Sequence, residues 1–331
     1  MTEQVRLDGR AAIVTGAGHG LGRAEALGLA AAGASVVIND LDGNGVDDTA
    51  AQIKDAGGTA VTSAGDIGEW STAQELLATA LREFGRLDIL VNNAGVLRDK
   101  MIFSMSPEEW DLVLRTHLRG HFLTSRVATA HWREASKQAG GEVYARIINT
   151  SSEAFLLGSS GQPNYAAAKG GITALTLTTA RSCARYGVRA NAICPRARTA
   201  MTGDLMGTAP ADGPDPLGAE YVAPLVTYLA SPAAANINGE VFVVHGGVAA
   251  VMAAPTVAAT FHANEHGSPD GMWTLDAIAD ALAGFGTGPS GAGFLCEDTL
   301  ALATETIGFG AGGGSSGQAA RPGRDVTGRG G

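Results

Sequence analysis

The 331-residue chain is poor in cysteine, in aromatic residues and in positive charge. Its three cysteines, Cys183, Cys194 and Cys296, lack the paired spacing of a disulfide framework or a zinc cluster, so we expect reduced thiols and no metal. Lysine and arginine total 23 against 33 aspartates and glutamates, a formal charge of −10. Because this charge leaves little basic surface for phosphates, the composition argues against DNA and RNA as partners.

Long apolar runs are also missing. No hydrophobic segment reaches the roughly 20 residues that span a bilayer, and the opening MTEQVRLDGR lacks the apolar core of an export signal. We therefore expect a soluble, cytoplasmic protein with no membrane partner. The length suits one substantial core, which predicts a single α/β domain with an appended tail.

From Arg10 onward, short β-rich runs alternate with longer helical patterns. This order predicts a doubly wound α/β Rossmann fold, in which a seven-stranded parallel sheet carries helices on both faces. The predicted strands are Ala11–Thr15, Ser35–Asn39, Thr59–Ala64, Ile89–Asn92, Arg146–Thr150, Arg189–Cys194 and Val241–Val244. The predicted helices are Leu21–Ala32, Gly45–Ala56, Trp70–Phe84, Pro107–Gln138, Tyr165–Tyr186 and Ala219–Ala230.

The pattern divides the chain into three parts. We predict the Rossmann domain over residues 1–250 and a C-terminal extension that packs on it over 251–307, with one more helix at Trp273–Ala283. Residues 308–331 are glycine-rich and aperiodic, which indicates a flexible tail. The segment Arg196–Gly218 is a long connection where a substrate lid could sit.

The first predicted strand leads into a glycine-rich turn, TGAGHGLG, that opens directly into a helix. Glycines there allow a tight turn, close approach of a pyrophosphate and exposure of a helix N-terminus to its negative charge. The alternative is a glycine turn that binds no ligand, but the strand before the turn and the helix after it favour a nucleotide site. The residues assigned to this site are Gly16, Gly18, His19, Gly20, Leu21 and Gly22.

The spacing of this turn resembles the TGxxxGxG of classical short-chain dehydrogenases/reductases, and the resemblance extends from about Leu7 to Gly247. It implies a nicotinamide dinucleotide. At the end of the second strand, Asp40 would accept hydrogen bonds from the adenosine ribose and repel a 2′-phosphate. His19 stands where NADP-preferring relatives often carry a basic residue. We therefore expect NAD rather than NADP. The alternative is that Asp40 is only a solvated residue in a turn.

The same resemblance implies further cofactor contacts beyond the glycine turn. They come from an Asp-Ile pair after the third strand, from the NNAG stretch after the fourth, and from the end of the sixth strand. These residues are Asp66, Ile67, Asn93, Ala94, Gly95, Pro195 and Thr199. Many relatives have glycine after the proline, where this chain has Arg196.

Tyr165-Ala-Ala-Ala-Lys169 places a phenol and an ammonium on one helix face. A nearby lysine and an oxidised nicotinamide both favour the phenolate, so Tyr165 can exchange a proton with the alcohol oxygen. By resemblance, Lys169 also holds the nicotinamide ribose and Ser152 hydrogen-bonds the substrate oxygen. Ser151 is the rival to Ser152, and serines acting only as helix caps are the structural alternative.

The helix before the catalytic strand departs from the common pattern. His117 stands where many members carry an asparagine that supports a proton-relay water. An imidazole can serve a relay with altered pH behaviour, or His117 can simply be a packed core histidine. No HExxH pattern is present, so the histidines do not imply a metal.

The HLRGHF stretch and the segment PRART resemble one branch, the (3R)-hydroxyacyl-CoA dehydrogenase domain of peroxisomal multifunctional enzyme type 2, or 17β-hydroxysteroid dehydrogenase type 4, with its actinobacterial single-domain relatives. The resemblance implies interconversion of a secondary alcohol and a ketone on an acyl-CoA or a steroid. Arg98, Lys100, Arg196 and Arg198 either meet a CoA phosphate or are solvated charges.

Two other functions fit the same residues: a biosynthetic ketoreductase, and an NAD-binding scaffold or redox sensor without turnover. By family resemblance we also expect a homodimer or homotetramer, built on the helices that begin near Pro107 and Tyr165. Small residues on the second helix, Ala166, Ala167, Gly170 and Gly171, would permit close helix approach.

Overall fold

The computed structural model describes residues 3–41, 43–203, 207–210, 212–257, 259–268, 270–283, 296, 298–299 and 301–302. Within them, one sheet has eight strands in the order β3-β2-β1-β4-β5-β6-β7-β8. The strands are β1 (Ala11–Thr15), β2 (Ser35–Asn39), β3 (Thr59–Thr62), β4 (Ile89–Asn92), β5 (Ala145–Thr150), β6 (Val188–Pro195), β7 (Val241–His245) and β8 (Val248–Val251). The predicted tail, 308–331, lies outside the described residues.

The eighth strand corrects the predicted seven-stranded, all-parallel sheet. The pairings from β3 through β7 are parallel, but β8 runs antiparallel to β7. A tight turn joins the two strands, and Gly246 in it has a φ of +47°. Along β8, half-buried residues alternate with exposed ones, as expected of an edge strand. Four residues with one exposed face carry too weak an apolar pattern to be predicted.

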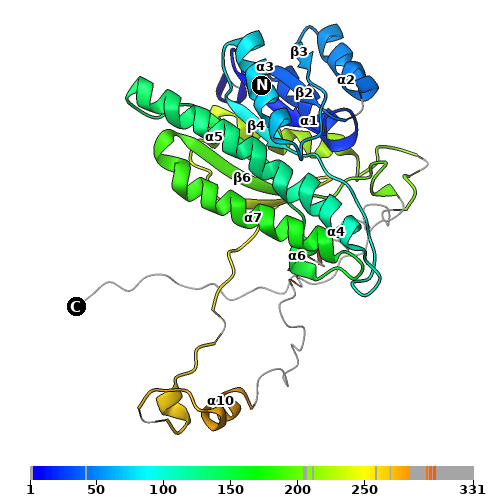
Figure 1. Ribbon diagram of the computed structural model, residues 1–331. Coiled ribbons are helices and arrows are strands. Elements are labelled where there is room, and N and C mark those ends of the chain that lie inside the picture. The colour runs from blue at the N-terminus through cyan, green and yellow to red at the C-terminus, as the bar shows by residue number, and fades with distance from the viewer. Residues whose placement is uncertain are drawn as a thin grey trace, which may run out of the picture.

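Helices cover both faces of the sheet (Figure 1). On one face, α1 (Gly20–Ala31), α2 (Gly43–Asp55) and α9 (Ala223–Ala230) enclose an apolar core that includes Val14 and Ile148. On the other face, α3 (Trp70–Phe84), α5 (Gly120–Ala139) and α7 (Pro163–Cys183) pack around Trp132 and Leu90. Short 3-10 turns are η1 (Glu3–Val5), η3 (Ala184–Tyr186), η4 (Ala219–Tyr221) and η5 (Pro232–Ala234).

The predicted helix Pro107–Gln138 is in fact interrupted. It consists of α4 (Pro107–Leu114), a π-helical turn η2 (Arg115–Arg119) and α5. The start of α4 is set by a capping box, in which Ser106 and Glu109 bind each other's backbone N–H. A π-helical turn holds one extra residue and often marks a functional site. Here it contains His117, which sequence periodicity alone did not single out as an irregular position.

The described residues of the C-terminal extension lie in two places, and its packing on the domain as a whole stays a prediction. A small lobe contains η6 (Ala263–His266) and α10 (Leu275–Leu282), the latter inside the predicted Trp273–Ala283. Figure 1 shows α10 away from the sheet, whereas Thr299 and Leu302 contact the Rossmann domain. Across the described ranges, no helix is both long enough and apolar enough to cross a membrane.

Candidate active site

The glycine turn between β1 and α1 leaves no room for side chains at its closest contact. A Cβ on Gly22 would lie 2.2 Å from the Gly16 carbonyl oxygen and 2.5 Å from Asn93 Nδ2. Gly16 and Gly20 have φ values of +64° and +53°, which favour glycine. The turn therefore leads into a helix N-terminus in the form that cradles a pyrophosphate, and the predicted residues fit a dinucleotide.

Asn93 braces this turn. Its Nδ2 donates to the Thr15 and Gly16 carbonyl oxygens at 3.1 and 3.0 Å, and its backbone N–H donates to Thr15 Oγ1 at 3.0 Å. The next residue, Ala94, lies against Gly16, because a Cβ on that glycine would come 2.7 Å from Ala94 Cα. The side chain predicted to touch the cofactor thus holds the turn that would bind it.

Asp40 lies at the same turn. Its Oδ2 accepts from the Gly18 N–H at 3.1 Å and its Oδ1 from the Leu41 N–H at 2.7 Å. His19 is exposed and lies over Gly45, and Leu21 is half-buried. A carboxylate accepts more than two hydrogen bonds, so Asp40 retains capacity for ribose hydroxyls.

The other predicted cofactor residues lie at the carboxyl ends of neighbouring strands. Asp66 accepts from Arg115 Nη1 at 2.7 Å and from the Gly68 N–H at 2.8 Å, and Ile67 is buried. A Cβ on Gly20 would lie 3.2 Å from Thr199 Cγ2, so Thr199 reaches the glycine turn from beyond β6. Pro195 is the last residue of β6.

Ser152, Tyr165 and Lys169 converge at this edge of the sheet. Ser152 follows β5, its Oγ accepts from the Ala154 N–H at 3.2 Å, and its hydroxyl lies close enough to Tyr165 to act on the pKa of the phenol. Tyr165 lies in the first turn of α7, and Lys169 Nζ is 5.3 Å from the centre of its ring. The helical spacing predicted from the sequence therefore places both side chains on one face.

Ser151 points elsewhere. It is buried, its Oγ donates to the Lys169 carbonyl oxygen at 3.0 Å, and it lies 2.7 Å from Thr173 Oγ1. These bonds tie α7 to the end of β5. Of the two rival serines, Ser152 is the one directed at Tyr165.

Burial sets the electrostatics of the phenol and the amine. It raises the pKa of Tyr165 to about 12, although the hydrogen bond from Ser152 opposes the shift. Burial also lowers the pKa of Lys169 to about 7, and its Nζ donates to the Thr150 carbonyl oxygen at 2.5 Å. Desolvation is the largest cause of the raised pKa of Tyr165, and Lys169 is not among the groups that shift it in the chain without a bound dinucleotide. A bound oxidised nicotinamide would place a positive charge beside the phenol and lower the pKa of Tyr165, which favours the phenolate.

His117 is buried against Tyr165, edge to face, with 5.3 Å between the ring centres. Its Nε2 lies 3.0 Å from the Val96 backbone nitrogen and 2.8 Å from the Val96 oxygen, contacts that require opposite tautomers. Its Nδ1 has no partner among the described residues. Burial, with the charge of Lys169, holds the pKa of His117 well below its usual value. His117 is thus a neutral imidazole in direct contact with the phenol.

Acid should destabilise the fold through His121, one turn beyond His117. Burial lowers the pKa of His121 to about 3. Below about pH 6.5 this histidine is therefore protonated in the unfolded chain but stays neutral in the folded chain. The unfolding free energy of wild type should therefore fall as the pH is lowered from 7 to 5. In His121→Phe we predict that this fall is smaller by about 2 kcal/mol, measured by urea denaturation at each pH. His262→Phe, at an exposed histidine, is the control. Equal losses in wild type and His121→Phe would contradict the assignment.

Two features of the site escaped sequence reasoning. A buried network joins Asn92 to Asn149 at 2.9 Å, and Thr124 and Thr176 extend it into α5 and α7. The second feature is Glu25 on α1, which is fully buried, without hydrogen-bond partners among the described residues and with its pKa raised to about 8 by burial. Its position three residues after Gly22, on the inward face of the helix, was the available signal.

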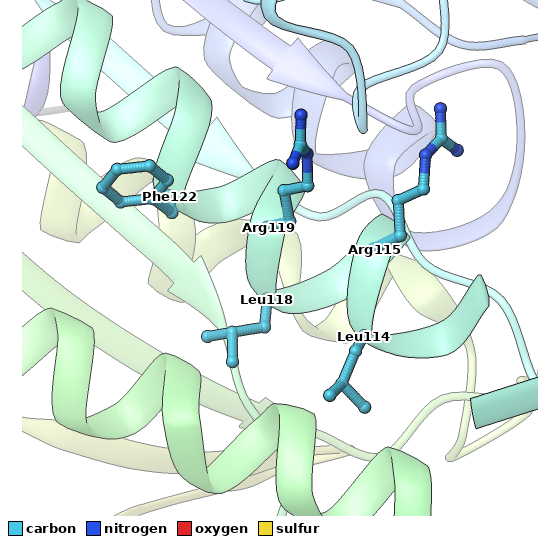
Figure 2. A pocket seen from close by; sticks show the side chains of 5 residues that line it. All are labelled: Leu114, Arg115, Leu118, Arg119 and Phe122. Carbon is cyan, nitrogen blue, oxygen red and sulfur yellow. The ribbon is translucent and has the colours of Figure 1, made fainter. Parts of the chain in front are cut away.

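A separate hollow lies on the outer surface of α4, η2 and α5. Its volume is about 370 Å³, and Figure 2 shows the five side chains that line it. They are Leu114, Arg115, Leu118, Arg119 and Phe122. None of them belongs to the Ser152, Tyr165 and Lys169 cluster, so this hollow is separate from the candidate catalytic residues.

Known proteins resemble this chain along most of its length. Over 272 residues it is 56% identical to hydroxyacyl-CoA dehydrogenase ChsB1 of Mycobacterium tuberculosis, covering 80% of this chain and 86% of that protein. It is 40% identical to peroxisomal multifunctional enzyme type 2 of Mus musculus, covering 75% of this chain but 33% of that longer protein. A short chain dehydrogenase structure from Mycobacterium avium superposes with a TM-score of 0.73 at 43% identity, covering 83% of this chain and 95% of that one.

The short chain dehydrogenase family model matches residues 10–208, which include the glycine turn, Ser152, Tyr165 and Lys169. Members of this family bind NAD or NADP and act on hydroxyl groups. The expected resemblance to multifunctional enzyme type 2 and to actinobacterial relatives is confirmed. The chain belongs to the short-chain dehydrogenase family and is an oxidoreductase.

Proposed function

We propose that this enzyme uses NAD to interconvert a (3R)-3-hydroxyacyl-CoA and the corresponding 3-ketoacyl-CoA. The convergence of Ser152, Tyr165 and Lys169 beside the glycine turn is the observation that carries the chemistry. The acyl-CoA substrate is supported by the relative named hydroxyacyl-CoA dehydrogenase, which matches most of this chain.

A bound nicotinamide would supply the hydride acceptor or donor. The turn from Gly16 to Gly22 would hold the pyrophosphate and Asp40 the adenosine ribose. Ser152 Oγ orients the substrate oxygen by hydrogen bonding, and Tyr165 takes the alcohol proton in oxidation or returns it in reduction. Lys169, while protonated, keeps a positive charge near the phenol. The neutral His117 ring packs edge to face with the Tyr165 ring and so limits the orientation of the phenol.

The substrate can be tested by measuring NADH formation with 3-hydroxyacyl-CoA thioesters of several chain lengths and both 3-configurations, with steroid alcohols as the competing class. We expect turnover of (3R)-thioesters. Folded protein that binds NAD but oxidises steroid alcohols alone would overturn the acyl-CoA assignment. Turnover with NADP but not NAD would overturn the cofactor assignment.

Asp40→Asn should weaken NAD binding about tenfold and narrow the preference for NAD over NADP. The carboxylate accepts strong hydrogen bonds from ribose hydroxyls and repels a phosphate, and an amide does neither as well. Titration calorimetry with each dinucleotide measures both effects. Asp55→Asn, at the exposed last residue of α2, is the matched control. An unchanged ratio of the two affinities in Asp40→Asn would show that the carboxylate does not select the cofactor.

We also propose that the chain is a homo-oligomer that uses the outer face of α4 and α5. Phe122 is 48% exposed beside the hollow lined by Leu114 and Leu118 (Figure 2). The small-residue stripe on α7 is partly used within the chain, since a Cβ on Gly171 would lie 2.8 Å from Leu118 Cδ2.

Phe122→Glu should convert the oligomer into a smaller species, because a charge in an apolar interface is not solvated. Light scattering measures the mass. Tyr228→Glu, on α9 across the sheet, is the control and should leave the mass unchanged. A monomeric wild-type mass would contradict the proposal.

A further inference from the structure

Arg196 is neither at a free phosphate site nor solvated, in contrast to both sequence-based expectations. It directly follows Pro195, and its side chain is 15% exposed. Its Nε and Nη2 donate to the two carboxylate oxygens of Glu153 at 2.7 and 2.6 Å. Because Glu153 is the residue after Ser152, this ion pair bridges the carboxyl ends of β5 and β6 beside the catalytic serine. A buried two-point pair of this kind has one rigid geometry.

The same guanidinium also binds the C-terminal extension. Arg196 Nη2 donates to the Thr299 carbonyl oxygen at 2.7 Å, and Thr299 is only 1% exposed. The Thr299 N–H and Oγ1 donate to the Cys296 carbonyl oxygen at 3.2 and 2.8 Å, which forms a turn. The Cys296 N–H donates to the Leu156 carbonyl oxygen at 3.3 Å. Leu156 belongs to α6 (Ala154–Leu157), the short helix that follows Ser152.

A third attachment lies farther along the chain. Leu302 packs against a buried apolar cluster formed by Ala192, Cys194, Val241 and Val243 on β6 and β7. We call Cys296, Thr299 and Leu302 the C-terminal anchor. The contacts of these described residues include α6, Arg196 and the sheet beneath them, so the anchor borders the segment that carries Ser152.

We propose that Arg196 is a positioning residue that fixes the C-terminal anchor beside Ser152 and α6, and that the anchor forms a wall of the substrate site that selects among acyl chains. The inference rests on the proposed function for the identity of the substrate. The charge of Arg196 is already compensated by Glu153, so the residue acts through the anchor rather than by binding a CoA phosphate.

Two full-length variants each remove a different attachment of the anchor. Arg196→Lys keeps a positive charge near Glu153 but loses the planar fork that reaches both Glu153 and Thr299. Leu302→Asp leaves Arg196 and Glu153 intact and places a charge against the apolar cluster. Arg189→Lys is the matched control, because Arg189 lies at the other end of β6 and pairs with Glu142 at 3.3 Å.

Both variants should raise the KM for a preferred 3-hydroxyacyl-CoA about tenfold and change kcat less than threefold, with the KM for NAD within twofold of wild type. The ratio of kcat/KM between long and short acyl chains should shift at least fivefold. Amide hydrogen exchange at Cys296 and Thr299 should accelerate at least tenfold, whereas Arg189→Lys should match wild type in every readout.

Unchanged exchange in both variants would overturn the inference, as would a loss of kcat with no change in substrate KM or chain-length preference. The exchange measurement needs no turnover. If wild type oxidised no acyl thioester, the proposed function would fail, while faster exchange in both variants would still support the attachment of the anchor by Arg196 and Leu302.

Discussion

Tyr165→Phe should lower kcat about 10³-fold while changing the Kd for NAD less than threefold. The variant loses the hydroxyl beside Ser152 that exchanges the substrate proton, and general acid–base catalysis is typically worth 10² to 10⁴ in rate. The ring itself remains, so its edge-to-face contact with His117 should persist. Stopped-flow measurement of single-turnover NADH formation, with NAD binding by fluorescence, separates the two quantities.

The control for this experiment is Tyr186→Phe. It removes an equivalent hydroxyl whose partners are Arg133 and Arg185 at the surface, and it should leave kcat unchanged. A Tyr165→Phe enzyme with near wild-type kcat would show that another group moves the proton. A Tyr165→Phe protein that kept every cellular role without turnover would instead favour the NAD-binding scaffold.

Gly22→Ala should weaken NAD binding at least 100-fold. The added Cβ would lie 2.2 Å from the Gly16 carbonyl oxygen and 2.5 Å from Asn93 Nδ2, distances that real structures do not tolerate. The N-terminus of α1 must therefore move away from the turn, and a displacement of about 1 Å at a binding or catalytic site can cost 10²-fold. The overpacking should also lower the unfolding free energy by about 1–3 kcal/mol. Titration calorimetry and urea denaturation measure the two effects.

Gly43→Ala provides the comparison for this steric argument. A Cβ at this exposed position, the first residue of α2, would meet no atom within 4 Å. Alanine has the higher helix propensity, so Gly43→Ala should be neutral or slightly stabilising and should bind NAD normally. If Gly22→Ala bound NAD as tightly as Gly43→Ala does, the glycine turn would not be the pyrophosphate site.

Several properties of the site were predictable because they depend on short stretches of sequence. The TGAGHGLG turn lies between a strand and a helix, and both flanking elements formed where their periodicity predicted them. The spacing from Tyr165 to Lys169 places both side chains on one helix face. The order of alternating strands and helices then brings Ser152 and Asp40 to the same edge of the sheet, since parallel strands end together.

Other properties arise from contacts between segments that are distant in the sequence. The roles of Ser151 and Ser152 separate only when α7 packs on β5, because one hydroxyl then binds the Lys169 carbonyl oxygen and the other reaches Tyr165. Burial, which has no local signature, raises the pKa of Tyr165 and lowers that of Lys169.

The amino-acid sequence by itself determined the alternating α/β order, the glycine turn and the helical spacing of the catalytic pair, because each follows from periodicity or from backbone conformations that few residues adopt. Only the tertiary structure decided the antiparallel edge strand, the π-helical turn that carries His117, and the pairing of Arg196 with Glu153 and Thr299. The contact between Arg196 and Thr299 joins residues 103 positions apart. Such a contact depends on how the whole chain packs, and no local pattern in the sequence encodes it.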